Sequence, residues 1–159
     1  MEPTIRVWLS ASKNLRNIRI GFNAQKWAVS EIDDASMNAR FTKSRRMSIG
    51  EHGLIYCSEN QSFTMPFTIL SKPRFEKITD VWPEPWGLPF SIEPLGSPGH
   101  RVPLYSAKRS WRCLHDVRNP THRLNGMNGK TVFVPNDIPE EDWQSIIRHL
   151  GFRPNDSPE

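Results

Sequence analysis

Two tryptophans in a proline-rich stretch are the residues of this chain best suited to hold a flat ligand. Trp82 and Trp86 are separated by two prolines and a glutamate and are followed by Gly-Leu-Pro. Proline removes a backbone donor and restricts the residue before it, so we expect a stiff, irregular loop here. The two indoles must either fold back onto the core or line a pocket. The prolines predict that the two rings are held apart before a ligand arrives.

A third tryptophan, Trp27, lies in a short predicted strand and can supply another wall of such a pocket. Stacking on an aromatic ring contributes about 1–3 kcal/mol per base and requires no particular hydrogen-bond pattern. Beside a basic surface, this arrangement predicts a nucleobase pocket. The other large aromatic residues at apolar strand or helix positions are predicted to belong to the core: Trp8, Phe41, Phe67, Phe90 and Trp143.

The charge of the chain favours a polyanionic partner only mildly, because 21 Lys and Arg residues stand against 17 Asp and Glu residues. The bases form two clusters, one at residues 40–46 and one at residues 101–123. Such clusters are solvated faces in most proteins, and contact with phosphates is the alternative.

Signals for catalysis or metal binding are weak. Cys113, His115 and Asp116 are nearly adjacent, but catalytic triads assemble from distant segments. The five His residues show no metal-ligand spacing with acids or cysteines, so we expect no metal and no cofactor. Phosphate-binding glycine loops, the nucleophile elbow, the zincin motif and paired C-x-x-C are all absent. We therefore expect a binding domain and not an enzyme.

Hydrophobic periodicity predicts about six short strands and two helices. The strands are expected at 5–9, 26–29, 54–57, 63–70, 90–95 and 130–134, with 54–57 central and Pro66 marking an edge or a bulge. One helix begins after Ser30 or Asp33 and runs to the basic cluster, and the other spans 139–150. Residues 15–20 are expected to be helical or irregular, and residues 102–104 to begin an irregular region.

These elements indicate an α+β domain, built on a small curved sheet or partial β-barrel with flanking helices. We expect one domain over residues 1–152, with 153–159 as a polar tail or linker. No apolar run approaches the length of a membrane span, and no signal-peptide pattern opens the chain, so a cytoplasmic location is expected.

The order of these features resembles the PUA-like modified-base readers of the EVE and YTH type. Residues 7–14, with the sequence VWLSASKN, and residues 26–29 are similar to the EVE pattern, as is the Gly-led buried strand 49–56. Val81-Trp82, the second Trp86 and the strand that follows are similar to YTH domains, with the second Trp one residue closer. The resemblance extends over most of residues 5–95.

The resemblance implies a cage of Trp27, Trp82 and Trp86 around the methyl group of a flipped base. It also implies that Asn14 or Asn17, and the backbone from Trp27 to Ser30, read the base edge, with Leu88 part of the same pocket. A basic residue common in YTH domains is Pro89 here, so phosphate contacts are expected from other bases: Lys43, Arg45, Arg46, Arg109 and Arg112.

The resulting hypothesis is a module that flips a methylated base into this cage. DNA is favoured over RNA as the partner, with 6-methyladenine ahead of 5-methylcytosine. The module would be the specificity domain of a modification-dependent restriction system, working with a nuclease or NTPase on another domain or chain. The alternatives are a reader of methylated RNA, a small enzyme using Cys113, and a protein-interaction domain with an exposed Trp loop.

Overall fold

The computed structural model describes residues 2–30, 33–115, 117–120, 123–128 and 131–153. Its strands are β1 (Thr4–Ser12), β2 (Lys26–Ser30), β3 (His52–Cys57), β4 (Ser62–Ile69), β5 (Lys77–Ile78), β6 (Trp86–Pro94), β7 (Arg101–Pro103) and β8 (Asn136–Pro139). Its helices are α1 (Leu15–Ala24), α2 (Asp34–Ser44), α3 (Leu104–Ser110) and α4 (Glu140–Leu150), with a 3₁₀ turn at Arg112–Leu114.

One mixed sheet organises the chain, in the order β2-β6-β4-β3-β1-β8, with β5 paired to β6 and β7 paired to β4. The predicted α+β class is confirmed, although the sheet has eight strands in place of about six. The central position predicted for 54–57 is also confirmed, because β3 lies between β1 and β4.

Three sequence-based assignments are wrong. Residues 131–134 form a turn in place of the predicted strand 130–134, and the strand comes later as β8. Val132 and Phe133 are buried in this turn, so their apolar character reflects packing and not strand pairing. Residues 101–110 are β7 and α3, where an irregular region was expected, because two-to-seven-residue elements carry little periodic signal. Strand β6 begins at Trp86, so the predicted loop is shorter than 80–90.

A bulge in β4 explains the proline in a central strand. Pairing with β3 passes from Gly53↔Phe67 to Ile55↔Thr64, which leaves one extra residue on β4 beside Pro66. Phe63 and Met65 consequently face different cores, although residues two apart in a strand normally share a face. The predicted bulge is confirmed.

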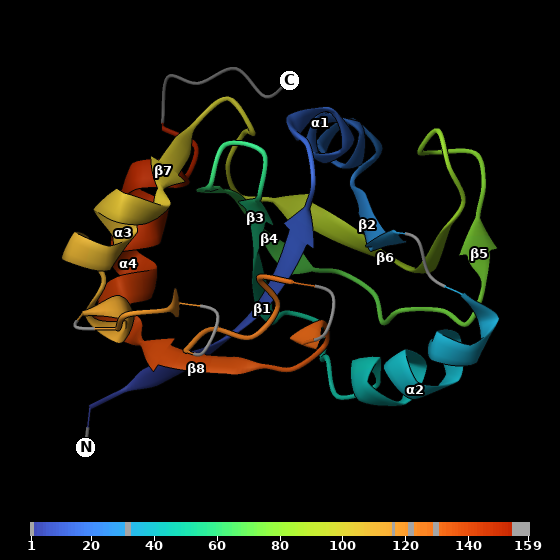
Figure 1. Ribbon diagram of the computed structural model, residues 1–159, viewed down its shortest axis with the longest axis horizontal. Coiled ribbons are helices and arrows are strands. Elements are labelled where there is room, and N and C mark those ends of the chain that lie inside the picture. The colour runs from blue at the N-terminus through green and yellow to red at the C-terminus, as the bar shows by residue number, and fades with distance from the viewer. Residues whose placement is uncertain (1, 31–32, 116, 121–122, 129–130, 154–159) are drawn as a thin grey trace.

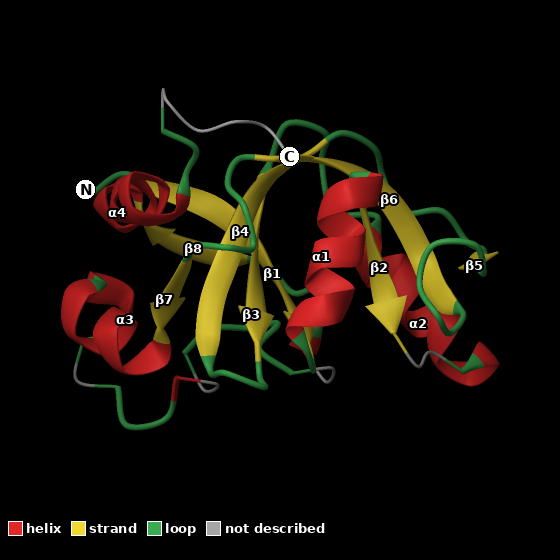
Figure 2. Cartoon of the chain, turned by 90° about the horizontal axis from the view of Figure 1, so that it is seen from above, coloured by secondary structure: helices red, strands yellow, loops and turns green. Residues whose placement is uncertain are grey.

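Local signals explain the three longer helices. Asn14 caps α1 and Asp33 caps α2, each accepting a backbone N–H three residues later. Helix α4 has three acids in its first turn and two bases in its last, which suits the helix dipole. Figure 2 shows α1 and α2 on one side of the central strands and α3 and α4 on the other.

The two sides have separate hydrophobic cores. Trp8, Trp27, Trp82 and Trp86 belong to the core beside α1 and α2, whereas Trp111 and Trp143 belong to the core beside α3 and α4. Strand β1 contributes alternately to both, with Trp8 in one core and Val7 and Leu9 in the other.

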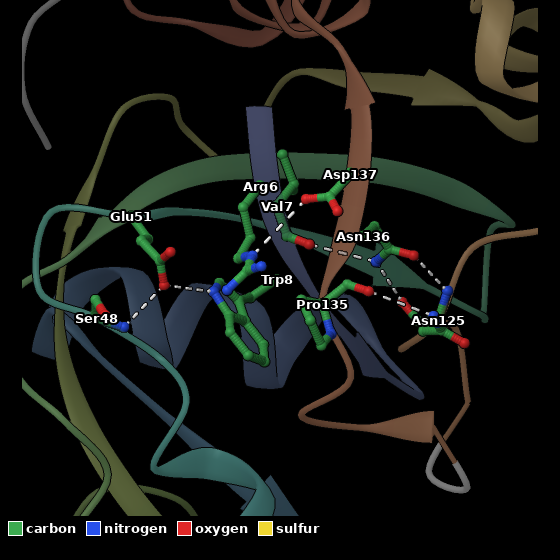
Figure 3. A network of polar contacts seen from close by, with 9 residues as sticks. All are labelled: Arg6, Val7, Trp8, Ser48, Glu51, Asn125, Pro135, Asn136 and Asp137. Carbon is green, nitrogen blue, oxygen red and sulfur yellow. Dashed lines mark hydrogen bonds and ion pairs between the residues drawn. The ribbon is translucent and has the colours of Figure 1, made fainter. Parts of the chain in front are cut away.

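A polar network fastens the segment before β8 to β1 (Figure 3). Asn136 Nδ2 donates to the carbonyls of Val7 (3.3 Å) and Asn125 (2.9 Å), and its Oδ1 accepts the Asn125 backbone N–H at 2.7 Å. On the opposite side of β1, Trp8 Nε1 donates to Glu51, which also accepts the Ser48 backbone N–H. The Asn136 bonds hold Asn125 beside β1.

Candidate nucleic-acid interface

The three predicted cage tryptophans are in mutual contact. The Trp82 and Trp86 rings stack with centroids 4.0 Å apart and 6° between their planes, and Trp27 meets both nearly at right angles. Each residue is only 2% exposed. The prediction that the prolines hold the rings apart is wrong, because two rings enclosing a base need a separation of about 7 Å.

Backbone and side-chain bonds fix this tryptophan cluster. Trp82 Nε1 donates to the Asn17 carbonyl of α1 at 3.0 Å. Trp86 opens β6 and pairs with Ser30, while Trp27 pairs with Phe90 four residues along β6. The loop therefore folds back onto the core, where the Trp82 and Trp86 rings pack against Trp27 of β2.

A cavity of about 420 Å³ lies between the C-terminal half of β1 and strand β2. Cavities of this size are typical of small-molecule sites. It is lined by Ser10, Ala11, Ser12, Lys13, Trp27, Ala28, Val29, Ser30, Arg40, Ser58, Met127, Asn128 and Val132. Trp27 and Ser30 of the predicted pocket are among them, whereas the other five predicted residues are not: Asn14, Asn17, Trp82, Trp86 and Leu88.

The cavity exists because two strand edges face each other without pairing. Within the described ranges β2 pairs only with β6, and β8 pairs with β1 only from Thr4 to Val7. The outer edges of residues 27–30 and 8–12 therefore carry backbone groups that no strand satisfies. A ligand that enters between the strands would meet these two edges.

Ser10 presents a further hydrogen-bonding group to the cavity. It is only 7% exposed, and its hydroxyl bonds to no described residue. The hydroxyl oxygen is not itself a buried unbonded atom, so it is accessible from the cavity and can donate to or accept from a polar ligand atom.

Arg40 brings positive charge to the cavity from α2. It is half-buried and forms no salt bridge within the described segments, although its charge is among the causes that lower the pKa of Asp33. Sequence reasoning placed Arg40 in a basic cluster but not in the site. The sequence could have indicated this, because Arg40 lies next to Met37, Phe41 and Ser44, the residues with which α2 packs against the sheet.

The two candidate asparagines have different tasks. Asn14 Oδ1 accepts the Asn17 backbone N–H at 2.9 Å and so serves as the helix cap. The Asn17 side chain is half-buried and bonds to no described residue, and the Asn17 carbonyl holds Trp82. Leu88 is fully buried in β6.

The five bases predicted to contact phosphates do not form one surface. Lys43, Arg45 and Arg46 are exposed around the end of α2, whereas Arg109 and Arg112 lie on and after α3, at the opposite end of the molecule (Figure 1). Arg112 also pairs with the carboxylates of Glu2 and Glu141. Only the α2 group is on the same side of the sheet as the cavity.

The Cys113 thiol is poorly suited to nucleophilic chemistry. Burial, together with the nearby Asp142 carboxylate, raises the pKa of Cys113 from 9.0 to about 12. The reactive thiolate is therefore scarce at neutral pH. His115 is exposed and contacts the Arg109 carbonyl, while Asp116 and His122 lie outside the described residues.

We expect the native protein to react very slowly with an aromatic disulfide reagent at pH 8. A pKa of about 12 in place of 9.0 lowers the Cys113 thiolate fraction roughly a thousandfold, and Cys57 is fully buried. Absorbance of the released thiol measures the rate, with urea-unfolded protein as the fast control. Rapid labelling that Cys113→Ser abolishes would contradict the geometry.

Metal and membrane features are absent from the ranges that the structure covers. No three His, Cys, Asp or Glu side chains there are grouped to hold a metal ion. None of the helices there has the length and apolar character of a membrane span.

Comparison with solved structures places the fold among known ones. The YTH domain of the Zygosaccharomyces rouxii MRB1 protein, in complex with N6-methyladenosine RNA, matches with a TM-score of 0.60 and 15% identity over 92% of this chain and 87% of that one. The Pho92 YTH domain in complex with m6A matches at 0.58 and 14% identity, over 96% and 87%. The Toxoplasma CPSF4 YTH domain with an m6A-modified RNA 7-mer matches at 0.56 and 14% identity, over 99% and 97%.

No family model and no curated protein sequence matches the chain. At these identities the structural matches establish the architecture. The predicted resemblance is thus confirmed at the level of structure: the chain has the fold of the YTH domains.

Proposed function

We propose that this protein is a reader of a methylated base in RNA, with the base bound in the cavity between β1 and β2. The observation that carries the proposal is that cavity, walled by Trp27 to Ser30 and by Arg40, in the fold of the YTH domains. Two solved YTH domains of this fold were determined in complex with N6-methyladenosine RNA. For this reason we favour RNA over the DNA expected from sequence.

The cavity provides groups for each part of a methylated base. Trp27 offers an aromatic contact, and the unpaired backbone edge of residues 27–30, with the Ser10 hydroxyl, can bond the polar base edge. Ala28, Val29 and Met127 give the methyl group apolar neighbours. Burying one methyl group contributes about 0.8 kcal/mol, enough for roughly fourfold discrimination.

In this proposal Trp82 and Trp86 support Trp27 from behind and do not enclose the base on two sides. Their stacking leaves no gap between the rings, and their contacts with Trp27 fix that side chain before binding. A side chain already fixed loses less entropy when the ligand arrives. Arg40 supplies a cation for the phosphate of the flipped nucleotide.

Neither Asn14 nor Asn17 lines the cavity, so we expect Asn17→Ala and Asn14→Ala to differ in stability and not in affinity. Asn17→Ala should leave both Tm and the affinity for methylated RNA nearly unchanged, because its side chain bonds to no described residue and lies outside the cavity lining. Asn14→Ala should lower stability by about 1 kcal/mol through loss of the cap, with affinity unchanged. Urea unfolding and fluorescence anisotropy separate the two effects.

The proposal is tested by titrating the protein against four labelled single strands of one sequence: RNA and DNA, each with and without one central N6-methyladenine. Methylated RNA should bind about fourfold more tightly than unmethylated RNA, the factor that burial of one methyl group supplies. A methylation ratio below about threefold in both polymers would sink the reader proposal. A fourfold ratio confined to DNA would sink the assignment to RNA and restore the polymer expected from sequence.

Arg40→Ala provides a matched measurement on the same strands. Because it removes a phosphate contact and no base contact, affinity for both RNAs should fall by a similar factor. The slope of log affinity against log salt should decrease in magnitude by about 0.7, the value for one contact to a single strand.

A further inference from the structure

A second hollow lies beside the cavity, between α1 and the segment that leads into β7. Two adjoining spaces of about 200 and 410 Å³ share Arg19, Pro98 and Gly99. The smaller one is also lined by Leu15, Asn60, Ser62, Thr64 and Arg101. In Figure 1 the β3–β4 turn and the approach to β7 lie at the same end of the sheet as α1. We call this hollow the α1–β7 groove.

Two cations in the groove have no protein counter-ion. Arg19 of α1 and Arg101 of β7 are both exposed, and neither forms an ion pair with a residue in the described ranges. They come from elements far apart in sequence and line the same small space. Two arginines that line one small space without a carboxylate are suited to bind an anion such as phosphate.

The groove also holds an acceptor without a donor. Asn60 Oδ1 is the one buried side-chain polar atom in the described ranges that makes no hydrogen bond. A buried acceptor in this state costs free energy unless a ligand or water donates to it. Neighbouring hydroxyls are already engaged, because Ser62 donates to the Asn60 carbonyl and Thr64 donates to the His100 carbonyl.

We propose that the α1–β7 groove binds the ribose phosphate of a nucleotide next to the flipped base. The phosphate would pair with Arg19 and Arg101, and the 2′-hydroxyl would donate to Asn60 Oδ1. A ribose phosphate carries both the anion and the hydroxyl donor that the groove requires. A deoxyribose phosphate lacks the 2′-hydroxyl and leaves the acceptor unsatisfied.

The groove and the cavity lie on either side of the same two short segments. Ser58 lines the cavity and Asn60 lines the groove, two residues along the β3–β4 turn. Lys13 lines the cavity and Leu15 the groove, two residues along the β1–α1 connection. The cavity and the groove are therefore adjacent along both segments. The inference rests on the proposed function, which supplies both the RNA strand and the flipped base.

The test uses unmethylated single strands, RNA and DNA of one sequence, so it does not depend on methyl recognition. Arg19→Ala and Arg101→Ala should each weaken RNA binding about fivefold at physiological salt and lower the magnitude of the salt slope by about 0.7. Arg16→Ala is the matched control, because Arg16 is an exposed arginine of the same helix that does not line the groove. Asn60→Ala should weaken RNA binding about threefold and leave DNA binding unchanged.

Three outcomes would overturn the inference. The first is that Arg19→Ala and Arg101→Ala weaken RNA binding no more than Arg16→Ala does. The second is that Asn60→Ala weakens RNA binding and DNA binding equally, which excludes the 2′-hydroxyl contact. The third is that a Glu-rich peptide competes with RNA and that its binding depends on both arginines in the same way, which would make the groove a general anion site. The methylation ratio of the wild type reports separately on the reader proposal, because groove variants should leave it unchanged.

Discussion

Trp27→Leu is expected to weaken binding of methylated RNA by about 5- to 150-fold. Trp27 is the one predicted cage residue with an aromatic ring that lines the cavity. Loss of an aromatic contact with a base costs about 1–3 kcal/mol, which corresponds to this range. The same change should lower folding stability by about 2–3 kcal/mol, because the side chain is 2% exposed and leucine leaves a void. Anisotropy titration at a temperature where the variant remains folded measures the affinity.

Trp8→Leu separates the loss of the contact from the loss of stability. Trp8 is 3% exposed and lies in the same core as Trp27, but it does not line the cavity. It should lose a comparable amount of stability, partly through its bond to Glu51, while the affinity of the folded protein stays within about twofold of wild type. Equal loss of affinity in both variants would mean that Trp27 acts only through the core.

Asp142→Ala is expected to lower the free energy of unfolding by about 3–5 kcal/mol. Asp142 lies in the first turn of α4 and is 2% exposed, and its two carboxylate oxygens accept the backbone N–H groups of Arg112 (2.9 Å) and Cys113 (2.8 Å). Each hydrogen bond to a charged group contributes about 1.5–3 kcal/mol, and truncation leaves the buried Cys113 N–H and the part-buried Arg112 N–H without a partner. Urea unfolding followed by far-UV circular dichroism measures the change.

Glu141→Ala is the matched control for Asp142→Ala. Glu141 is the preceding residue, is exposed, and makes only a 3.3 Å ion pair with the exposed Arg112 side chain. Exposed pairs of this kind contribute at most about 1 kcal/mol. Asp142→Asn should fall between the two, because the amide keeps one acceptor. A loss below 1 kcal/mol in Asp142→Ala would show that the two backbone bonds do not hold the 3₁₀ turn to α4.

Much of the fold follows from local pattern in the sequence. Alternation in residues 5–9 predicts β1, the apolar run 54–57 predicts a central strand, and Asp33 predicts the start of α2. Pro66 predicts the bulge in β4. Each of these signals lies within a few residues, so it can be interpreted without the partner strand. The buried turn at Val132 and Phe133 lacks such a signal, because these residues are apolar in order to pack against residues distant in sequence.

The cavity was only partly predictable for the same reason. Trp27 and Ser30 were expected from a resemblance in sequence order, and both line it. Arg40 and Ser10 come from α2 and β1, and only the folded sheet brings them to β2. The stacking of Trp82 on Trp86 depends on how β6 begins and on the Asn17 carbonyl that receives the Trp82 indole. The residue spacing alone gives no information about either.

The most direct test of the account is the indole N–H spectrum of ¹⁵N-labelled protein with a short RNA that carries one N6-methyladenosine. The six tryptophans give six separate probes, assigned by single Trp→Phe variants. The Trp27 signal should shift strongly with methylated RNA and less with the unmethylated strand, while Trp111 and Trp143, in the other core, stay in place. An unchanged Trp27 signal at saturating methylated RNA would contradict the proposed site.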